Sequence, residues 1–132
     1  MDDKFAISER LNAYIWPIDT HDAAAFADNF HDDGVYESPF GTATGRNHIL
    51  GTISQWHAGG VTAGKRHMMG TWTIDVKGDR ATSQSSHWVV NALDGTSIVA
   101  TGAYDDVLTR VGGVWKLQSR KQTINPSFRM GA

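Results

Sequence analysis

The sequence predicts a single α+β domain in which three N-terminal helices pack on one face of a strongly curved, mostly antiparallel sheet. Two observations carry this prediction. Apolar residues recur at helical spacing up to about residue 60, whereas the second half holds stretches rich in β-branched and aromatic residues, separated by short glycine-containing turns. Helices followed by a meander of strands are typical of helices that cover one face of an antiparallel sheet. Because 132 residues is an ordinary length for one domain, we expect one domain over 1–132.

The first helix is predicted over residues 4–16, because apolar residues there fall on one helix face. These residues are Phe5, Ile7, Leu11, Tyr14 and Ile15. Pro17 has no backbone N–H to continue the helix, so we expect a kink or break at that position. A second helix is expected over about 21–30, with Asp19 or Thr20 as its N-cap.

A short strand is predicted over 35–38, followed by a loop over 38–45 that contains proline and glycine. The third helix is predicted over about 46–56 and ends at Gly59.

Four long strands are predicted in the second half of the chain. They cover 66–76, 81–92, 97–110 and 114–123. The turns between them are short and contain glycine, at 77–79, 93–95 and 111–113. Tight turns of this kind join antiparallel neighbours, so the four strands are expected to form a meander.

Composition excludes several classes of function. A net charge of −2 gives no general attraction to nucleic acid or to an anionic membrane surface. The chain has no cysteine, which removes thiol nucleophiles, disulfides and thiolate metal sites. No apolar stretch approaches the roughly 20 residues that span a bilayer. The first residues lack the basic and apolar regions of a signal peptide, so we expect a cytoplasmic protein.

Motifs for a metal or a cofactor do not occur. The six histidines are dispersed, and none forms a His-x-x-x-His or His-Glu-x-x-His pattern. There is no Gly-x-Ser-x-Gly element, glycine-rich phosphate loop or dinucleotide fingerprint either. We therefore expect neither metal nor cofactor.

Asp19 and His67 are the residues with the clearest chemical potential, and each has a structural alternative. Asp19 is either a helix N-cap, paired with Asp22 in a capping-box-like arrangement, or a carboxylate that points under the sheet. His67 shares a strand face with Met69, and a lone histidine in such a place is more often structural. If the two pair, the carboxylate fixes the imidazole tautomer and raises the basicity of the other ring nitrogen.

The ordered set Tyr14, Asp19, His67 and Arg120 makes the chain similar to a known family. Over nearly its whole length, the sequence resembles the SnoaL-like branch of the NTF2-like superfamily, the group that includes scytalone dehydratase. The segments that carry the resemblance are 19–22, 30–36, 45–49, 66–70, 78–81, 102–106 and 112–116. Each segment alone is a weak match to the family, whereas the order and spacing of all the segments together are fairly specific.

The resemblance implies a cone-shaped, barrel-like fold with a deep apolar pocket, in a homo-oligomer such as a dimer or trimer. It also implies a catalytic Asp–His pair, and Asp19 and His67 match that pair by context and separation. By analogy, His67 acts as general base, and Asp19 orients its imidazole and favours the charged form. Tyr14 or Arg120 supports the leaving oxygen or halide. The implied activity is a cofactor-free lyase that acts on a small apolar or aromatic ring compound.

Six further residues are candidates for the pocket wall. They are Tyr36, Phe40, Trp56, Met69, His87 and Trp88. For the five other than His87, ordinary core packing is an equal alternative. For His87, a structural role is the first expectation and a pocket-lining role the second.

Fold does not decide among the activities of this superfamily. One alternative is an isomerase or polyketide-cyclase-type enzyme that uses the same pair. A second is a non-catalytic ligand-binding protein, or the small subunit of a ring-hydroxylating dioxygenase.

Overall fold

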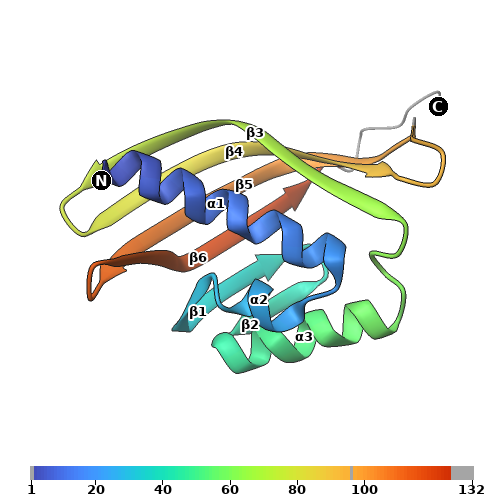
Figure 1. Cartoon of the computed structure of the whole chain (residues 1–132), viewed down its shortest axis with the longest axis horizontal. Coiled ribbons are helices and arrows are strands. Elements are labelled where there is room, and N and C mark those ends of the chain that lie inside the picture. The colour runs from blue at the N-terminus through green and yellow to red at the C-terminus, as the bar shows by residue number, and fades with distance from the viewer. Residues whose placement is uncertain (1, 96, 126–132) are drawn as a thin grey trace.

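The computed structural model describes residues 2–95 and 97–125. Three helices and six strands lie in these ranges, and Figure 1 shows their arrangement. In chain order they are α1 (Asp3–Thr20), α2 (Ala23–Ala27), β1 (Phe30–Ser38), β2 (Gly41–Thr44), α3 (Arg46–Ala58), β3 (Lys65–Lys77), β4 (Arg80–Asn91), β5 (Ile98–Val111) and β6 (Val114–Ile124). None of the described helices is long and apolar enough to cross a membrane.

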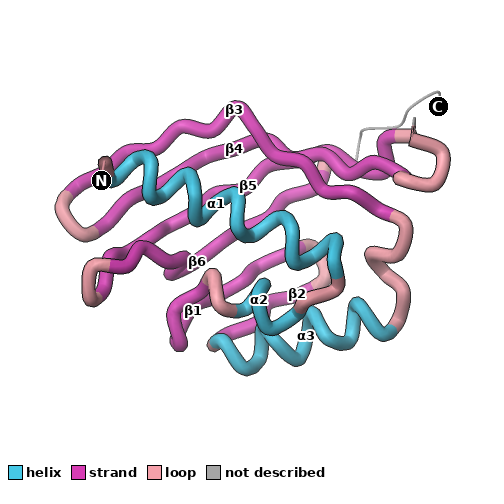
Figure 2. The backbone as a smooth tube through the Cα atoms, viewed as in Figure 1, coloured by secondary structure: helices cyan, strands magenta, loops and turns pink. Residues whose placement is uncertain are grey.

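The six strands form one mixed sheet with the order β2-β1-β6-β5-β4-β3. All neighbours are antiparallel except β1 and β6, which run parallel with Tyr36 opposite Arg120. The sheet curls around α1, which lies along it, while α2 and α3 pack near β1 and β2 (Figure 2). The α+β architecture and the four-strand meander are confirmed. The sheet is curled but not closed, so the expected barrel form is wrong: within the described residues β2 and β3 remain as two separate edges.

Helix α1 continues through Pro17, and the break expected there does not occur. A proline at this position leaves the carbonyl of Ala13 without its usual helical donor. The side-chain amide of Asn29 donates to that carbonyl at 3.2 Å and replaces the missing bond. The helix then ends at His21, whose positive φ of 62° and N–H bond to the Pro17 carbonyl close its last turn.

Asp22, and neither Asp19 nor Thr20, is the N-cap of α2. Its carboxylate accepts a hydrogen bond from the backbone N–H of Ala25 at 3.0 Å. The expected capping role of Asp19 is therefore wrong, because the longer α1 includes this residue in its final turn. Its side chain is free to reach the sheet.

The region between α2 and α3 holds more strand than the sequence suggested. β1 begins at Phe30, inside the expected second helix, and its pairing with β6 is irregular between Phe30 and Val35. β2 lies in the segment expected to be a loop. Its four residues are too few to show a reliable alternating pattern.

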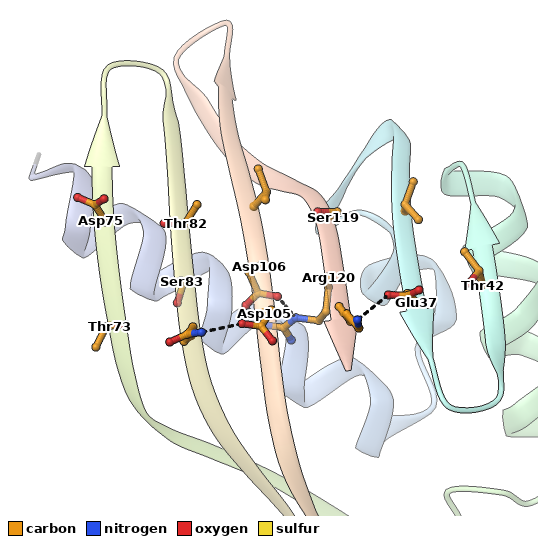
Figure 3. A pocket seen from close by; sticks show the side chains of 14 residues that line it. Glu37, Thr42, Thr73, Asp75, Thr82, Ser83, Asp105, Asp106, Ser119 and Arg120 are labelled. Carbon is orange, nitrogen blue, oxygen red and sulfur yellow. Dashed lines mark hydrogen bonds and ion pairs between the residues drawn. The ribbon is translucent and has the colours of Figure 1, made fainter. Parts of the chain in front are cut away.

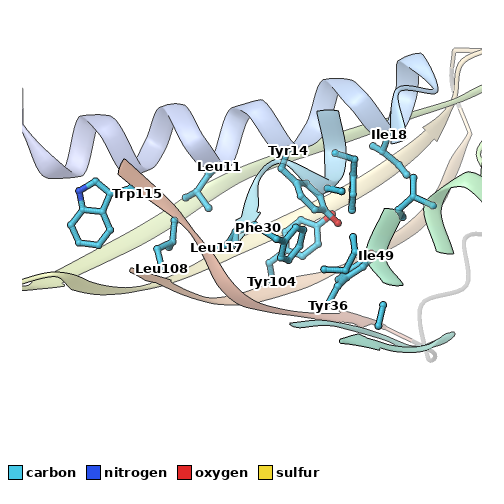
Figure 4. Close-up of a cluster of buried hydrophobic side chains, with 14 of the residues drawn as sticks. Leu11, Tyr14, Ile18, Phe30, Tyr36, Ile49, Tyr104, Leu108, Trp115 and Leu117 are labelled. Carbon is cyan, nitrogen blue, oxygen red and sulfur yellow. The ribbon is translucent and has the colours of Figure 1, made fainter. Parts of the chain in front are cut away.

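The core lies between α1 and the concave face of the sheet, as Figure 4 shows. Tyr14 of α1 stands at its centre. Its ring centroid is 4.5 Å from that of Phe26 and 5.7 Å from that of Tyr104, with Phe30 and Tyr36 at 6.4 and 6.3 Å. Burial of a large apolar side chain contributes about 1.5–3 kcal/mol. This cluster therefore fixes α1, and with it Asp19, against the sheet.

Candidate active site

Asp19 and His67 meet under the sheet, although 48 positions separate them in the chain. Asp19 Oδ1 lies 2.6 Å from His67 Nδ1. The backbone N–H of His67 also donates to the same carboxylate, at 2.9 Å to Oδ2 and 3.2 Å to Oδ1. The side chains of Asp19 and His67 are only 5% and 14% exposed. The last turn of α1 and the start of β3 are thus joined through a shielded carboxylate.

This geometry assigns the tautomer of His67. A carboxylate accepts hydrogen bonds, so Nδ1 carries the proton that it donates to Asp19. In the neutral form of the ring, Nε2 then holds the free lone pair. Within residues 2–95 and 97–125 no group hydrogen-bonds to Nε2, and the ring lines a cavity. The arrangement can accept a proton from a molecule in that cavity.

The cavity has a volume of about 260 Å³, close to the lower end of roughly 300 Å³ for small-molecule sites. Its wall is mainly apolar and aromatic. The aromatic members are Tyr14, Tyr36, Phe40, Trp56 and Tyr104, so all three tyrosines of the chain face one space. Thr62, Lys65 and Gln122 add polar groups to the wall. The Tyr36 hydroxyl donates to the side-chain oxygen of Gln122 at 2.6 Å.

The three tyrosines are hydrogen-bond donors rather than anions at neutral pH. Burial raises the pKa of Tyr14, Tyr36 and Tyr104 well above the ordinary value of 10.0. The positive charge of Arg120 opposes this rise for each of them. A protonated phenol beside a buried cation is a polarised donor, suited to an oxygen that gains negative charge.

Arg120 does not line the cavity, contrary to its expected direct role. Its side chain is fully buried and binds Asp106 with two bonds of 2.7 Å, from Nε and Nη2. The guanidinium is sandwiched between two rings, with Cζ 4.0 Å from the Tyr14 centroid and 3.9 Å from the Tyr104 centroid. Burial lowers the pKa of Arg120, but the charge and hydrogen bonds of Asp106, together with Tyr14 and Tyr104, outweigh burial, and the pKa is raised. Arg120 acts on the cavity through the tyrosines.

Three of the expected wall residues lie elsewhere, whereas Tyr36, Phe40 and Trp56 line the cavity. Met69 shares the inner face with His67 but packs against the core. Trp88 follows a buried position on β4 and faces the other side of the sheet, where it pairs with Met68. Neither Met69 nor Trp88 is among the residues that line this cavity, because strand alternation defines a face of the sheet and not a depth along it.

His87 is also absent from the cavity wall, which favours its structural alternative. It is 2% exposed, stacks on Tyr104 with centroids 4.5 Å apart, and its Nε2 lies 3.0 Å from the Thr123 carbonyl. Burial lowers the pKa of His87, and the bond to that carbonyl opposes the change. The ring therefore supports Tyr104 from behind.

Tyr104, Gln122 and Asp106 are site residues that the sequence reasoning missed. A signal for Gln122 existed. Residues two apart on a strand share a face, so the orientation of Gln122 follows from that of Arg120, which the sequence did single out. Asp106 was not paired with Arg120, because the register between β5 and β6 joins these two positions across 14 residues of chain.

A larger hollow of about 620 Å³ lies on the opposite face of the sheet. Figure 3 shows this face, with α1 behind the strands. Most of its lining residues are polar or charged, among them Glu37, Asp75, Asp105 and Lys121. No histidine lines it and it lacks the aromatic wall, so the smaller inner cavity is the candidate active site. In the described part of the chain, no three acidic or histidine side chains come together as metal ligands would.

A family model described as a SnoaL-like domain matches residues 1–121. The chain belongs to the SnoaL-like family. This family includes polyketide cyclases and dehydratases. Among curated proteins, no sequence matches this SnoaL-like chain closely enough to count as a relative.

Several solved structures share the fold of this chain. An NTF2-like protein with a cystatin-like fold from Novosphingobium aromaticivorans is 28% identical, with a TM-score of 0.85 over 96% of this chain and 84% of that one. A putative scytalone dehydratase from the same species is 22% identical, with a TM-score of 0.76 over 98% and 90%. A protein from Catenulispora acidiphila in complex with S-DNPA is 22% identical, with a TM-score of 0.80 over 92% of each chain. At these identities the last two show a shared fold alone.

Proposed function

We propose that this protein is a cofactor-independent lyase that removes water, or a related leaving group, from a small ring compound. The observation that carries the proposal is the 2.6 Å contact between Asp19 Oδ1 and His67 Nδ1, beside a mainly aromatic cavity. A free imidazole nitrogen that is backed by a carboxylate and shielded from water is a competent general base.

In this proposal His67 Nε2 takes a proton from a carbon of the bound ring. The electron pair of that C–H bond forms the new double bond, and the C–O bond to the leaving hydroxyl breaks. The hydroxyl takes the proton from His67 and departs as water, which returns the imidazole to its starting form. General base catalysis of this kind contributes roughly 10²- to 10⁴-fold in rate. Asp19 stabilises the imidazolium that exists between the two transfers.

The tyrosines supply stabilisation for the developing charge. Tyr14 lines the cavity, and its ring lies against the guanidinium of Arg120. Its hydroxyl is the donor that we assign to the oxygen of the substrate. Arg120 increases the strength of that donor without touching the substrate.

The comparisons support this proposal at the level of the family. Cyclases and dehydratases of this family act on ring compounds, and one similar structure is that of a putative scytalone dehydratase. Another is a complex with a small ligand, S-DNPA. A homo-oligomer and a cytoplasmic location stay predictions, and light scattering of the purified protein tests the first.

An isomerase is the second candidate, and one feature of the cavity favours it. Among the described residues, no aspartate or glutamate lines the cavity, so no carboxylic acid stands ready to protonate a leaving hydroxyl. A single imidazole that takes a proton from one carbon and returns it to another needs no such acid.

The test uses a panel of hydroxylated ring compounds and ring ketones in deuterated water. Mass spectrometry reports loss of water as elimination, and deuterium at carbon without loss of mass as isomerisation. We expect His67→Ala and Asp19→Asn to reduce turnover by at least 10²-fold and about 10-fold respectively. His48→Ala, an exposed histidine outside the cavity wall, is the matched control and keeps full turnover. Full activity in both site variants, with folding confirmed by circular dichroism, removes the mechanism.

A further inference from the structure

Lys65 is a charged residue of the cavity wall that the proposed reaction does not use. It is the first residue of β3 and lies two positions before His67. Residues two apart on a strand project from the same face, and both of these side chains line the cavity. At about 3.3 Å per residue, the two side chains leave the strand roughly 7 Å apart.

The positive charge of Lys65 has no partner of opposite sign in the described part of the chain. Its ammonium donates to the carbonyl of Val61 at 2.6 Å, which uses one of its three protons and leaves the charge uncompensated. None of the ion pairs among residues 2–95 and 97–125 includes Lys65. Two N–H donors and a full charge are therefore available to a ligand.

The rest of the wall does not cancel this charge. No carboxylate among the described residues lines the cavity. The carboxylate that contacts His67, Asp19, is 5% exposed and accepts hydrogen bonds from the ring and the backbone N–H of His67. The ion pair of Arg120 and Asp106 is internally neutral and lies behind the tyrosines. The cavity therefore presents a net positive potential to its occupant.

The position of Lys65 also gives the occupant an orientation. Lys65 bonds to Val61, which is 48% exposed, whereas Tyr14, which also lines the cavity, is 2% exposed. Lys65 therefore stands at the mouth and the tyrosines form the floor. An ionised group costs less free energy to bind at the mouth than at the floor, because it keeps part of its hydration there.

We propose that Lys65 binds an anionic oxygen of the ligand and that the substrate class is a small ring compound with an acidic substituent, such as a carboxylate or an ionised phenol. This deepens the proposed function and rests on the same cavity. The ring lies among the aromatic side chains, and its anionic group reaches the ammonium. The atom that His67 deprotonates then lies a few bonds from that group. A volume of about 260 Å³ limits the ring system to one or two fused rings.

Three probes of equal ring size test the proposal by isothermal titration calorimetry: 2-naphthoate, 2-naphthalenemethanol and 2-naphthylmethylammonium. The unchanged protein is expected to bind the carboxylate most tightly and the ammonium least. Lys65→Met is expected to weaken binding of 2-naphthoate about tenfold and to change binding of the alcohol less than twofold. Lys65→Arg keeps most of the affinity for the carboxylate.

Salt and a matched variant separate a local charge effect from a general one. Added salt is expected to weaken 2-naphthoate binding in the unchanged protein and to have little effect in Lys65→Met. Lys77→Met removes an equal charge from the far end of the same strand, where the side chain is 84% exposed, and is expected to leave all three affinities unchanged.

Several outcomes overturn the proposal. The first is that Lys65→Met and the unchanged protein bind 2-naphthoate equally tightly. The second is that the unchanged protein prefers the alcohol or the ammonium to 2-naphthoate. The third is that the unchanged protein does not bind 2-naphthoate at millimolar concentration. His67→Ala distinguishes this failure from that of the lyase proposal. It removes turnover if the lyase proposal holds, but it keeps the preference for the carboxylate, because Lys65 is unchanged.

Discussion

The side-chain amide of Asn29 donates to the carbonyl of Ala13, the carbonyl that Pro17 leaves without a helical donor. The same side chain accepts a hydrogen bond from Arg10 Nη1 at 3.0 Å. Through these contacts the residue before β1 holds the middle of α1. The final turn of α1, and hence Asp19, keeps its direction although a proline lies two residues earlier.

Asn29→Ala is expected to lower the free energy of unfolding by about 1–3 kcal/mol, because it removes the hydrogen bonds that the buried Asn29 side chain makes with the Ala13 carbonyl and with Arg10. Pro17→Ala restores a backbone N–H that can bond to that carbonyl. The double variant is therefore expected to lose less stability than the sum of the two single variants. Urea denaturation of all four proteins measures this difference, and strictly additive losses contradict the explanation.

Arg120→Met is expected to destabilise the protein by about 3–5 kcal/mol, because the buried Asp106 carboxylate keeps its charge without a cation. The double variant Arg120→Met with Asp106→Leu removes both charges and is expected to recover most of the loss. Chemical denaturation provides the measurement. A double variant no more stable than Arg120→Met shows that packing between the two tyrosine rings, and not the charge, is what matters.

Gly102→Ala is expected to destabilise the protein by about 3 kcal/mol or more, by forcing the backbone apart. A Cβ atom at this position would stand 1.9 Å from the Thr123 carbonyl oxygen and 2.7 Å from His87 Nε2. Both contacts are far inside van der Waals separation. Gly51→Ala, where a Cβ meets nothing within 4 Å, is the control and is expected to keep or raise stability, because alanine favours the helix α3 more than glycine does. Equal thermal midpoints for the two variants rule out this close approach.

Acid is expected to destabilise the protein through His87, because burial lowers the pKa of His87 below the ordinary 6.5. Below that value the unfolded chain binds a proton that the folded protein resists, so the free energy of unfolding falls as pH decreases. One such group contributes a slope of up to about 1.4 kcal/mol per pH unit. Above about pH 7 both states hold the ring neutral and the contribution is flat.

The test compares how the free energy of unfolding changes with pH in the unchanged protein and in His87→Gln. Urea denaturation between about pH 7.5 and pH 5 measures it. His57, whose pKa is also lowered by burial, is present in both proteins and cancels in the difference. A smaller acid-induced loss in His87→Gln is the expected result. Identical slopes mean that His87 is free to ionise in the folded protein.

The sequence predicted the parts of the fold that depend on short-range chemistry. Glycine-containing turns and β-branched stretches located β3 to β6 to within a few residues, and apolar spacing located α1 and α3. Pro17 misled the local reasoning, because the donor that compensates for it comes from Asn29, outside the helix. The candidate site residues likewise divide into those that the sequence identified and those whose environment depends on the tertiary fold. Asp19 and His67 were named by their order in the chain, whereas the depth of Met69 and the enclosure of Arg120 depend on the curl of the sheet.

The bond from the His67 backbone to Asp19 has a consequence for the solubility of the protein. β3 is an edge strand, and an unpaired N–H on such an edge is a template on which another chain can add a strand. The Asp19 carboxylate occupies that N–H with a negative charge. The Asp19 carboxylate, which we propose orients the base, therefore also blocks strand addition, and hence aggregation, at this open edge of the sheet.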